Sequence, residues 1–279
     1  MENILLALDG THLDMNTIEF ACYAATITHS KLTAIFVENL KGEERPRLKQ
    51  LYALPYVETI TAEDFPENEK KKASSQENER IFGEACTNRG VNYRIHRNRQ
   101  STVRDMIDES RFADMIIVNP ATSFLDETES APSQFVRDLL AGAECPVIIS
   151  PYSFDGIDEI LFAYDGSKSA TFAFKQFVHL FPSLQSKKLT VLQVDKKSIQ
   201  PFKEGEKISE LLRAHFSSVR FEHLQGKPAN ELFGYLLGKQ NLFVVMGAYG
   251  RGILSNLFAQ STADLVVKTI NLPLFIAHA

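Results

Sequence analysis

The sequence lacks the long apolar segment that a membrane-spanning helix requires. No apolar run in the 279 residues approaches the roughly 18 residues of such a span, so we expect no membrane partner. The first three residues carry no basic cluster, and the apolar run at 4–8 is too short for the core of a secretion signal. We therefore expect a cytoplasmic protein.

The sequence also has few cysteines and no net positive charge. The three cysteines, Cys22, Cys86 and Cys145, are odd in number and widely spaced, which argues against a disulfide framework and a zinc ligand set. We expect them to be buried as small hydrophobic residues. The 30 basic and 35 acidic residues give a formal net charge of −5. Nucleic acid is therefore not an expected partner, because a phosphate backbone requires a basic surface.

Several signatures of catalysis are missing. The sequence has no Gly-x-x-x-x-Gly-Lys-Ser/Thr loop and no Gly-x-Ser-x-Gly motif. Its seven histidines are scattered without a metal-ligand pair at helical spacing. No pair of carboxylates is obvious on one catalytic face. We expect neither catalytic residues nor a metal site built from protein side chains.

The sequence does contain an internal repeat. At roughly 150 residues per domain, the length already indicates about two domains. Four segments of the first half return in the same order in the second half: 4–11 as 160–167, 31–37 as 188–194, 113–118 as 240–246, and 145–149 as 272–276. We infer two copies of one domain, 1–151 and 152–279.

Each copy alternates short apolar runs with amphipathic stretches. The runs at 4–8, 33–37, 115–118 and 147–149 are continuous, as expected for strands that are covered on both faces of a parallel sheet. Between such runs, Phe174, Phe177, Val178 and Phe181 share one helical face, with Ser169 as a candidate N-cap. Pro228 suits the first turn of another helix. The pattern predicts two tandem, doubly wound α/β domains, each with a five-stranded parallel sheet.

Two local features belong to the first copy alone. The extra segment at 41–69 carries Pro46, Pro55 and Pro66, and we expect a loop or irregular excursion. A basic run extends from Arg89 to Arg104. It is either a patch for an anion or partner, or the solvated face of an edge strand containing Val91, Tyr93 and Ile95.

The candidate site lies where parallel strands end. Ligands of such sheets bind beyond the carboxyl ends of the strands, where the second copy has Asp165-Gly166-Ser167 and a glycine-rich segment at 247–252. The glycines allow close approach of backbone N–H groups, Arg251 offers planar donors, and a helix start near 260–263 favours anions. Plainer interpretations remain open: a turn at Asp-Gly, a tight loop, a solvated arginine and a simple N-cap.

These residues resemble the universal stress protein family. In nucleotide-binding members, strand four is followed by Gly, two residues, Gly, nine residues, Gly, and Ser or Thr. Here Gly247 and Gly250 match the first two glycines, Gln260 replaces the third, and Ser261 matches the hydroxyl residue. Asp165 matches the family's aspartate after strand one, and Pro273 matches its proline before the last strand.

The resemblance implies an adenine nucleotide, ATP above all, with Mg²⁺ carried by the phosphates. Asp165 and Val194 would contact the adenosine side, and Gly247, Gly250, Arg251, Ser261 and Thr262 would hold phosphates. The full set of implied cofactor-binding residues is Ala163, Asp165, Val194, Met246, Gly247, Gly250, Arg251, Gly252, Gln260, Ser261 and Thr262. Domains of the family commonly pair through their last strands, so 147–149 and 274–276 would meet about a pseudo-two-fold axis. The chain would then be a monomeric pseudo-dimer or a homodimer.

The first copy departs from the family's pattern. Asn119-Pro120-Ala121-Thr122 replaces 247–250, and Asp126, Glu127 and Glu129 would repel phosphate. We predict that this copy has lost its nucleotide site. The function expected is a regulatory, nucleotide-binding stress-response protein. The alternatives are a protein-interaction module that needs no nucleotide and, more remotely, an enzyme that uses ATP to activate a substrate.

Overall fold

A computed structural model describes residues 3–37, 45–51, 54–60, 66–96, 102–123, 129, 131–196, 201–202, 204–247 and 271–277. Within these ranges, ten strands form one sheet in the order β10-β9-β8-β11-β12-β7-β6-β1-β2-β5. The strands of the first half are β1 (Asn3–Asp9), β2 (Lys31–Val37), β5 (Tyr93–His96), β6 (Met115–Val118) and β7 (Val147–Ile149). Those of the second half are β8 (Glu159–Ala163), β9 (Lys188–Asp195), β10 (Val219–Gln225), β11 (Leu242–Gly247) and β12 (Leu274–Ala277).

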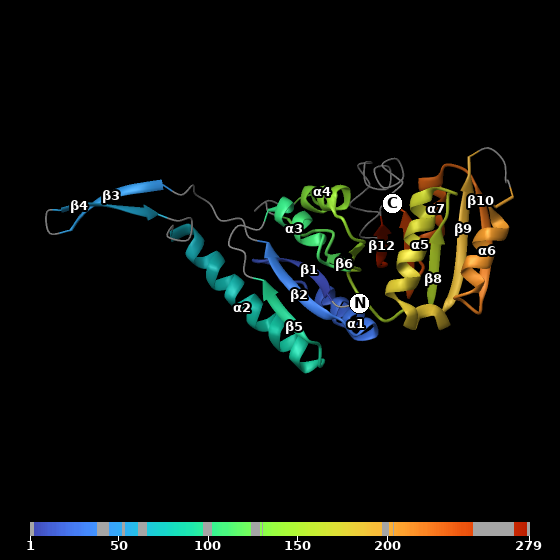
Figure 1. The fold of residues 1–279 in the computed structure, drawn as a ribbon, viewed down its shortest axis with the longest axis horizontal. Helices are drawn as coiled ribbons and strands as arrows, with labels where there is room; N and C mark the ends of the chain where they lie inside the picture. Colours follow the sequence, from blue (N-terminus) through green and yellow to red (C-terminus); the bar gives the residue numbers. More distant parts are fainter. Residues whose placement is uncertain are drawn as a thin grey trace.

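The strand order is symmetric about the centre of the sheet. Pairing within each half is parallel, whereas β7 and β12 pair antiparallel, with Ile148 opposite Phe275. Each half has its first strand between its second and fourth, so both are doubly wound in the same way (Figure 1). The predicted fold class and the meeting of the two last strands are therefore confirmed. The boundary at 151/152 stays a prediction.

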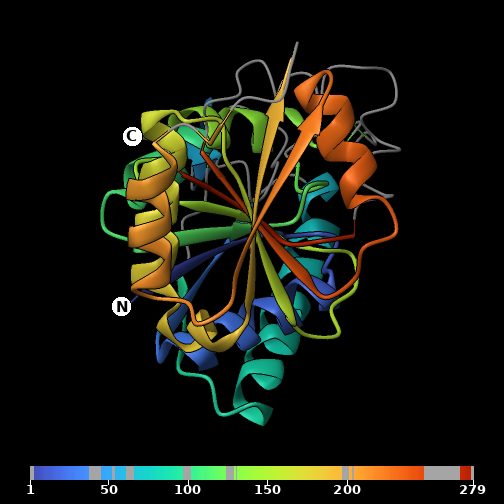
Figure 2. The ribbon, with the colours of Figure 1, turned by 90° about the vertical axis from the view of Figure 1, so that its right-hand side faces the viewer.

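Helices cover both faces of the sheet, and the strands fan out because the sheet twists (Figure 2). One face packs against α1 (Met15–Thr28), α2 (Pro66–Asn88), α5 (Lys168–Leu180), α6 (Gly205–Arg213) and the short 3-10 helix Pro182–Ser186. The other packs against α3 (Val103–Ser110), α4 (Gln134–Gly142) and α7 (Pro228–Leu236). This double covering explains the continuous apolar strands. None of the described helices is both long and apolar enough to cross a membrane.

Side-chain caps define where the helices begin. Asp14 caps α1 through the N–H of Asn16, and Thr102 forms a capping box with Asp105 at α3. Pro228 occupies the first turn of α7, as predicted. The predicted cap of α5, Ser169, is wrong. Ser167 accepts the N–H of Ala170 instead, because α5 starts directly after the Asp-Gly turn.

A cluster of phenylalanines forms the centre of the core. Phe174 and Phe177 lie on the buried face of α5, as the spacing predicted, and Phe181 is the buried residue that caps its C-terminus. The Phe177 ring contacts those of Phe162, Phe181, Phe243 and Phe275 at centroid distances of 5.1–5.7 Å. Phe20 of α1 reaches the ring of Phe243 at 6.2 Å. The aromatic core therefore continues from one half into the other.

The segment at 41–69 is more regular than predicted. It contains an antiparallel hairpin, β3 (Arg45–Leu51) and β4 (Leu54–Ile60), and the start of α2 at Pro66. Two prolines are tolerated in the hairpin because each strand of an isolated pair has one unpaired edge, where a missing N–H costs no ladder bond. The hairpin extends away from the large sheet at one end of the molecule (Figure 1).

Two smaller predictions are confirmed. All three cysteines are free and buried. β5, which contains Tyr93 and Ile95, is an edge strand, whereas Val91 precedes it. Two arginines of the basic run, Arg97 and Arg99, lie outside the described residues.

The phenylalanine cluster gives a stability test. Phe177 is 0% exposed and Phe112 is 81% exposed. Phe177→Ala should lower the free energy of unfolding by about 3–5 kcal/mol, because it removes buried contacts and leaves a cavity. Phe112→Ala makes the same chemical change in solvent and should stay within about 0.5 kcal/mol of the wild type. Urea unfolding followed by circular dichroism measures both, and equal losses would contradict the core assignment.

Candidate functional site

The candidate site of the second half lies at the switch point of its strand order. The chain runs outward from β8 to β9 and β10 and returns to β11 on the other side of β8. The carboxyl ends of β8 and β11 therefore lie side by side at this switch point, which is where doubly wound sheets bind ligands. Ala163 at the end of β8 lies opposite both Leu192 of β9 and Met246 of β11.

Three of the predicted residues form an apolar wall at this edge. Ala163, Val194 and Met246 come from three adjacent strands and belong to the cluster on the face that α7 covers. Met246 is buried, whereas Ala163 and Val194 are partly exposed. The structure therefore brings together three of the implied cofactor-binding residues, and their contact with a nucleotide stays a prediction.

The aspartate after the first strand organises a turn in both halves. Asp165 Oδ1 accepts the Ser167 N–H at 2.9 Å. The corresponding Asp9 Oδ1 accepts the N–H of Thr11 at 2.7 Å, its hydroxyl at 2.8 Å and the N–H of His12 at 3.0 Å. The turn interpretation of Asp-Gly is thus correct. A ligand role for Asp165 is compatible with it, because a carboxylate can accept several hydrogen bonds.

Gly247 is required by packing at the end of β11. A Cβ atom built on it would lie 2.5 Å from the Ala170 nitrogen and 2.5 Å from the Ser169 carbonyl carbon. These are backbone atoms in the first turn of α5 and cannot move aside easily. The structure thus shows a helix terminus approaching this glycine, and the phosphate contact that the resemblance implies for Gly247 stays a prediction.

The other implied residues of the phosphate site follow β11 in the sequence. Gly250, Arg251, Gly252, Gln260, Ser261 and Thr262 lie outside the described residues. Elsewhere, in the ranges the structure does describe, no group of three His, Cys, Asp or Glu residues is placed to hold a metal ion.

The first half fills the corresponding position with a side chain. Val118 lies opposite Ala7 as Met246 lies opposite Ala163, so Asn119 takes the place of Gly247. Asn119 Nδ2 donates to Asp14 Oδ2 at 2.6 Å and to Thr17 Oγ1 at 3.1 Å, and its Oδ1 accepts the Ala121 N–H at 2.8 Å. Thr17, which is fully buried, also lies 2.8 Å from Ser150 Oγ.

The start of the first helix makes room for this network. α1 is capped at Asp14, whereas α5 is capped at Ser167, which corresponds to Thr11 in the repeat. The helix of the first half thus starts about one turn later and leaves space for the Asn119 side chain. Sequence reasoning missed Asp14, Thr17 and Ser150. A three-residue shift of the cap between the copies is the signal that could have revealed them.

Helix α2 also contacts the first-half edge, through hydrogen bonds to the turn after β1. Asn78 Nδ2 donates to the Gly10 carbonyl oxygen at 2.8 Å, and Ser74 Oγ donates to that of Thr11 at 3.4 Å. Both acceptors belong to the turn after β1. Polar side chains of the chain itself therefore occupy the edge where a first-half ligand would bind.

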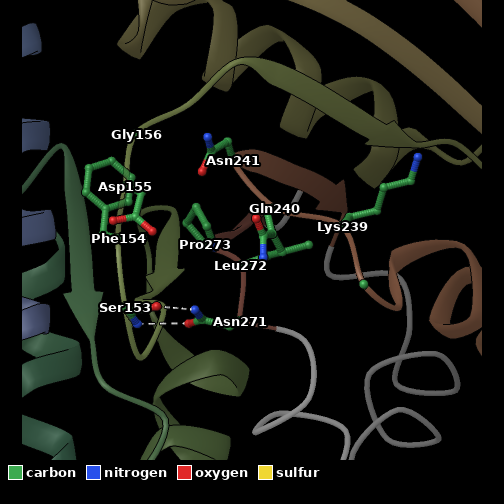
Figure 3. Close-up of a pocket in the computed structure, with 11 residues that line it drawn as sticks. Ser153, Phe154, Asp155, Gly156, Lys239, Gln240, Asn241, Asn271, Leu272 and Pro273 are labelled. Carbon is green, nitrogen blue, oxygen red and sulfur yellow. Dashed lines mark hydrogen bonds between the residues drawn. The ribbon is translucent and has the colours of Figure 1, made fainter.

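Apart from this edge, a polar cavity of about 180 Å³ lies at the link between the halves (Figure 3). It borders the amino ends of β11 and β12, opposite to Gly247. The Ser153 N–H donates to Asn271 Oδ1 at 2.9 Å, and Asn241 Nδ2 donates to Asp158 Oδ2 at 3.0 Å. These bonds attach the link between the halves to the segments that precede the two strands, so we assign this cavity a structural role.

Solved structures share the fold over the whole chain. A universal stress protein from Archaeoglobus fulgidus superposes with a TM-score of 0.64 at 16% identity, covering 99% of this chain and 96% of that one. A protein of unknown function from Pseudomonas aeruginosa PAO1 gives 0.54 at 16% identity, covering 99% and 92%. A candidate universal stress protein from Pseudomonas aeruginosa UCBPP-PA14 gives 0.50 at 15%, covering 99% and 92%.

The comparisons establish the fold and no finer property. No protein-family model matches the sequence, and no curated protein matches it. At 15–16% identity, structural likeness shows the fold alone. The chain has the α/β fold of the universal stress proteins along nearly its full length.

The contact at Gly247 can be tested with a matched pair of variants. Gly247→Ala should lower the free energy of unfolding by about 1–3 kcal/mol, because its methyl group would overlap backbone atoms of α5. Gly234 is an exposed position in α7 with nothing within 4 Å of an added Cβ. Gly234→Ala should leave stability unchanged or raise it by up to about 1 kcal/mol. Urea denaturation compares the two, and a neutral Gly247→Ala would overturn the packing requirement.

Proposed function

We propose that this chain is a universal stress protein that binds one adenine nucleotide, ATP above all, in its second half. The observation that carries the proposal is the difference between the two copies at one position. Where the first half has the hydrogen-bonded Asn119 side chain, the second half has Gly247 beside Ala163 and Met246. The Asn119 side chain thus closes the first-half edge, whereas in the second half α5 packs on Gly247 and the small Ala163 stays partly exposed at the end of β8.

The chemistry of the second edge suits an adenosine group. The partly exposed apolar side chains of Ala163 and Val194 would offer a surface for the base, and the Asp165 carboxylate lies two residues beyond the end of β8. A ligand site that combines an apolar lining with a few placed polar groups is the usual arrangement for a small molecule. The base and ribose would therefore lie over the ends of β8, β9 and β11.

The phosphates would continue from there into the glycine-rich segment. Gly250 and Gly252 can present backbone N–H groups, Arg251 adds a fixed positive charge, and Ser261 and Thr262 supply hydroxyl groups. Gln260 takes the place of a backbone-packing glycine and would either donate to a phosphate or narrow the site. Mg²⁺ would be held mainly by the phosphates, as is usual for nucleotide-bound magnesium.

We propose a regulatory role rather than catalysis. A general base for attack on the γ-phosphate is not evident in the sequence, so any hydrolysis should be slow. The nucleotide would then act as a ligand whose presence alters what the protein binds. We place this role in a cytoplasmic stress response, as the family resemblance implies.

We propose that the chain functions as a monomeric pseudo-dimer. β7 and β12, the fifth strands of their halves, pair with each other inside one chain. This pairing covers two sheet edges that would otherwise be open. Assembly into a homodimer would require a different surface.

A protein-interaction module that needs no nucleotide is the second candidate. The observation that favours it is the β3–β4 hairpin, which extends from the body of the molecule (Figure 1). An isolated two-stranded hairpin is marginally stable in water, so contact with a partner protein would stabilise it. Pull-down partners whose binding is insensitive to ATP would support this candidate.

Titration calorimetry with Mg-ATP tests the nucleotide proposal. The wild type should bind one equivalent per chain. Gly250→Val should weaken binding at least tenfold, about 1.4 kcal/mol, because a branched side chain would displace phosphate from the backbone N–H groups. Thr122→Val changes the matching position of the first half and should leave affinity unchanged. Circular dichroism confirms that both variants fold. Two equivalents in the wild type, or an unaffected Gly250→Val, would contradict the placement.

A further inference from the structure

Two cysteine sulfurs meet where α1 packs against α2. Cys22 Sγ and Cys86 Sγ are 3.9 Å apart, and their residues are 1% and 0% exposed. The two residues are 64 positions apart in the sequence. The third thiol, Cys145, lies in the cluster on the opposite face of the sheet. The first half therefore contains a buried dithiol that the nucleotide proposal does not use.

The surroundings of the pair make its two sulfurs unequal. The hydrogen bond with Cys86 lowers the pKa of the Cys22 thiol and the Arg89 guanidinium lowers it further, whereas burial and the Glu19 carboxylate oppose the change. The same hydrogen bond and burial raise the pKa of Cys86. Cys22 is therefore the sulfur of the pair that ionises more readily.

Arg89 also fixes the geometry beside the pair. Its Nη2 donates to Glu19 Oε1 of α1 at 2.8 Å, and its Nη1 donates to the Ala85 carbonyl oxygen of α2 at 3.2 Å. Both helices are thus held together within a turn of the two sulfurs. Closing the gap to a disulfide requires about 1.9 Å of approach, the difference between 3.9 Å and a bond of about 2.05 Å.

We propose that Cys22 and Cys86 are an oxidation site that a small hydroperoxide converts into a disulfide joining α1 to α2. The oxidant must be small because both sulfurs are shielded from solvent, so it reaches them when the helices open locally. Redox-active cysteines are those with thiolate character and a second thiol nearby to resolve the first product. The geometry supplies the second thiol, 3.9 Å from the first, at this one place in the described chain.

The reaction is balanced without any further reactant. The Cys22 thiolate attacks one oxygen of the hydroperoxide, the O–O bond breaks, and a sulfenic acid forms as the other oxygen leaves and takes up a proton. The Cys86 sulfur then attacks the Cys22 sulfur, the S–O bond breaks, and water leaves. With hydrogen peroxide, two thiols and one peroxide yield one disulfide and two waters. The cysteines are oxidised and the peroxide is reduced.

The disulfide would act on an element that covers the first-half edge. α2 carries Asn78 and Ser74, whose side chains bind the turn after β1. A covalent link at Cys86 would hold this helix in place and close a long loop in the unfolded chain. Oxidation should therefore raise the melting temperature by roughly 5 °C or more, and reduction should reverse the rise.

Peptide mapping of the full chain tests the site directly. Reduced native protein is treated with hydrogen peroxide, quenched with catalase, alkylated with N-ethylmaleimide in denaturant and digested with trypsin. Cleavage after Lys and Arg releases Cys22 in residues 1–31, Cys86 in 81–89 and Cys145 in 138–168. We expect the first two peptides to be linked, two hydrogen atoms lighter than their sum. Burial raises the pKa of the Cys145 thiol to about 12, so this thiol should not react with peroxide. Its peptide should therefore be recovered with an alkylated cysteine.

Variants and melting curves provide the controls. Cys145→Ser should still form the link and show the reversible rise in melting temperature, whereas Cys22→Ser and Cys86→Ser should show neither. Peptide mapping of the wild type remains decisive if a variant fails to fold. Recovery of all three cysteines as alkylated thiols would overturn the proposal, as would separate sulfinic or sulfonic acids at Cys22 and Cys86. A linked peptide pair without a change in melting temperature would contradict the inference that the disulfide holds α2 in place.

Discussion

The antiparallel pairing of β7 with β12 is the constraint on which the molecule depends. Each half is a parallel sheet whose fifth strand would expose unpaired N–H and C=O groups if it stood alone. The pairing of Ile148 with Phe275 joins the two edges, and contacts such as Phe20 with Phe243 continue the core across the join. Because the pairing is antiparallel, the strands of the two halves run in opposite directions. Their carboxyl edges therefore lie on opposite sides of the sheet and could diverge in function independently.

The two copies diverged at those edges while their topology stayed the same. The later start of α1 leaves space in the first half for Asn119, which joins Asp14 and Thr17 in a partly buried network of hydrogen bonds. In the second half α5 starts at once, and its first turn leaves no space for a Cβ at Gly247. A difference of about one helical turn therefore separates an edge where a side chain packs against α1 from one where the backbone of α5 packs on a glycine.

The sequence predicted the topology well because the chain contains two copies of the same pattern of strands and helices. Repeated apolar runs located the strands, and the double covering of the sheet made those runs continuous, so strand type and order followed from elementary rules. It failed where a local signal had two meanings. Prolines at 46 and 55 indicated a loop, but an isolated hairpin tolerates them. Ser169 and Ser167 are both acceptable caps, and tertiary contact with Gly247 decides between them. Asn119, Asp14 and Thr17 came together only through the fold.

The most direct test of the account is the nucleotide content of the purified chain. Protein prepared without added nucleotide is denatured, and the released small molecules are separated by chromatography and compared with the protein concentration. The account predicts an adenine nucleotide at up to one equivalent per chain, held by the second half. Two equivalents would contradict the conclusion that Asn119 and its partners fill the first-half edge. No nucleotide, together with no thermal shift on adding Mg-ATP, would contradict the proposed site itself.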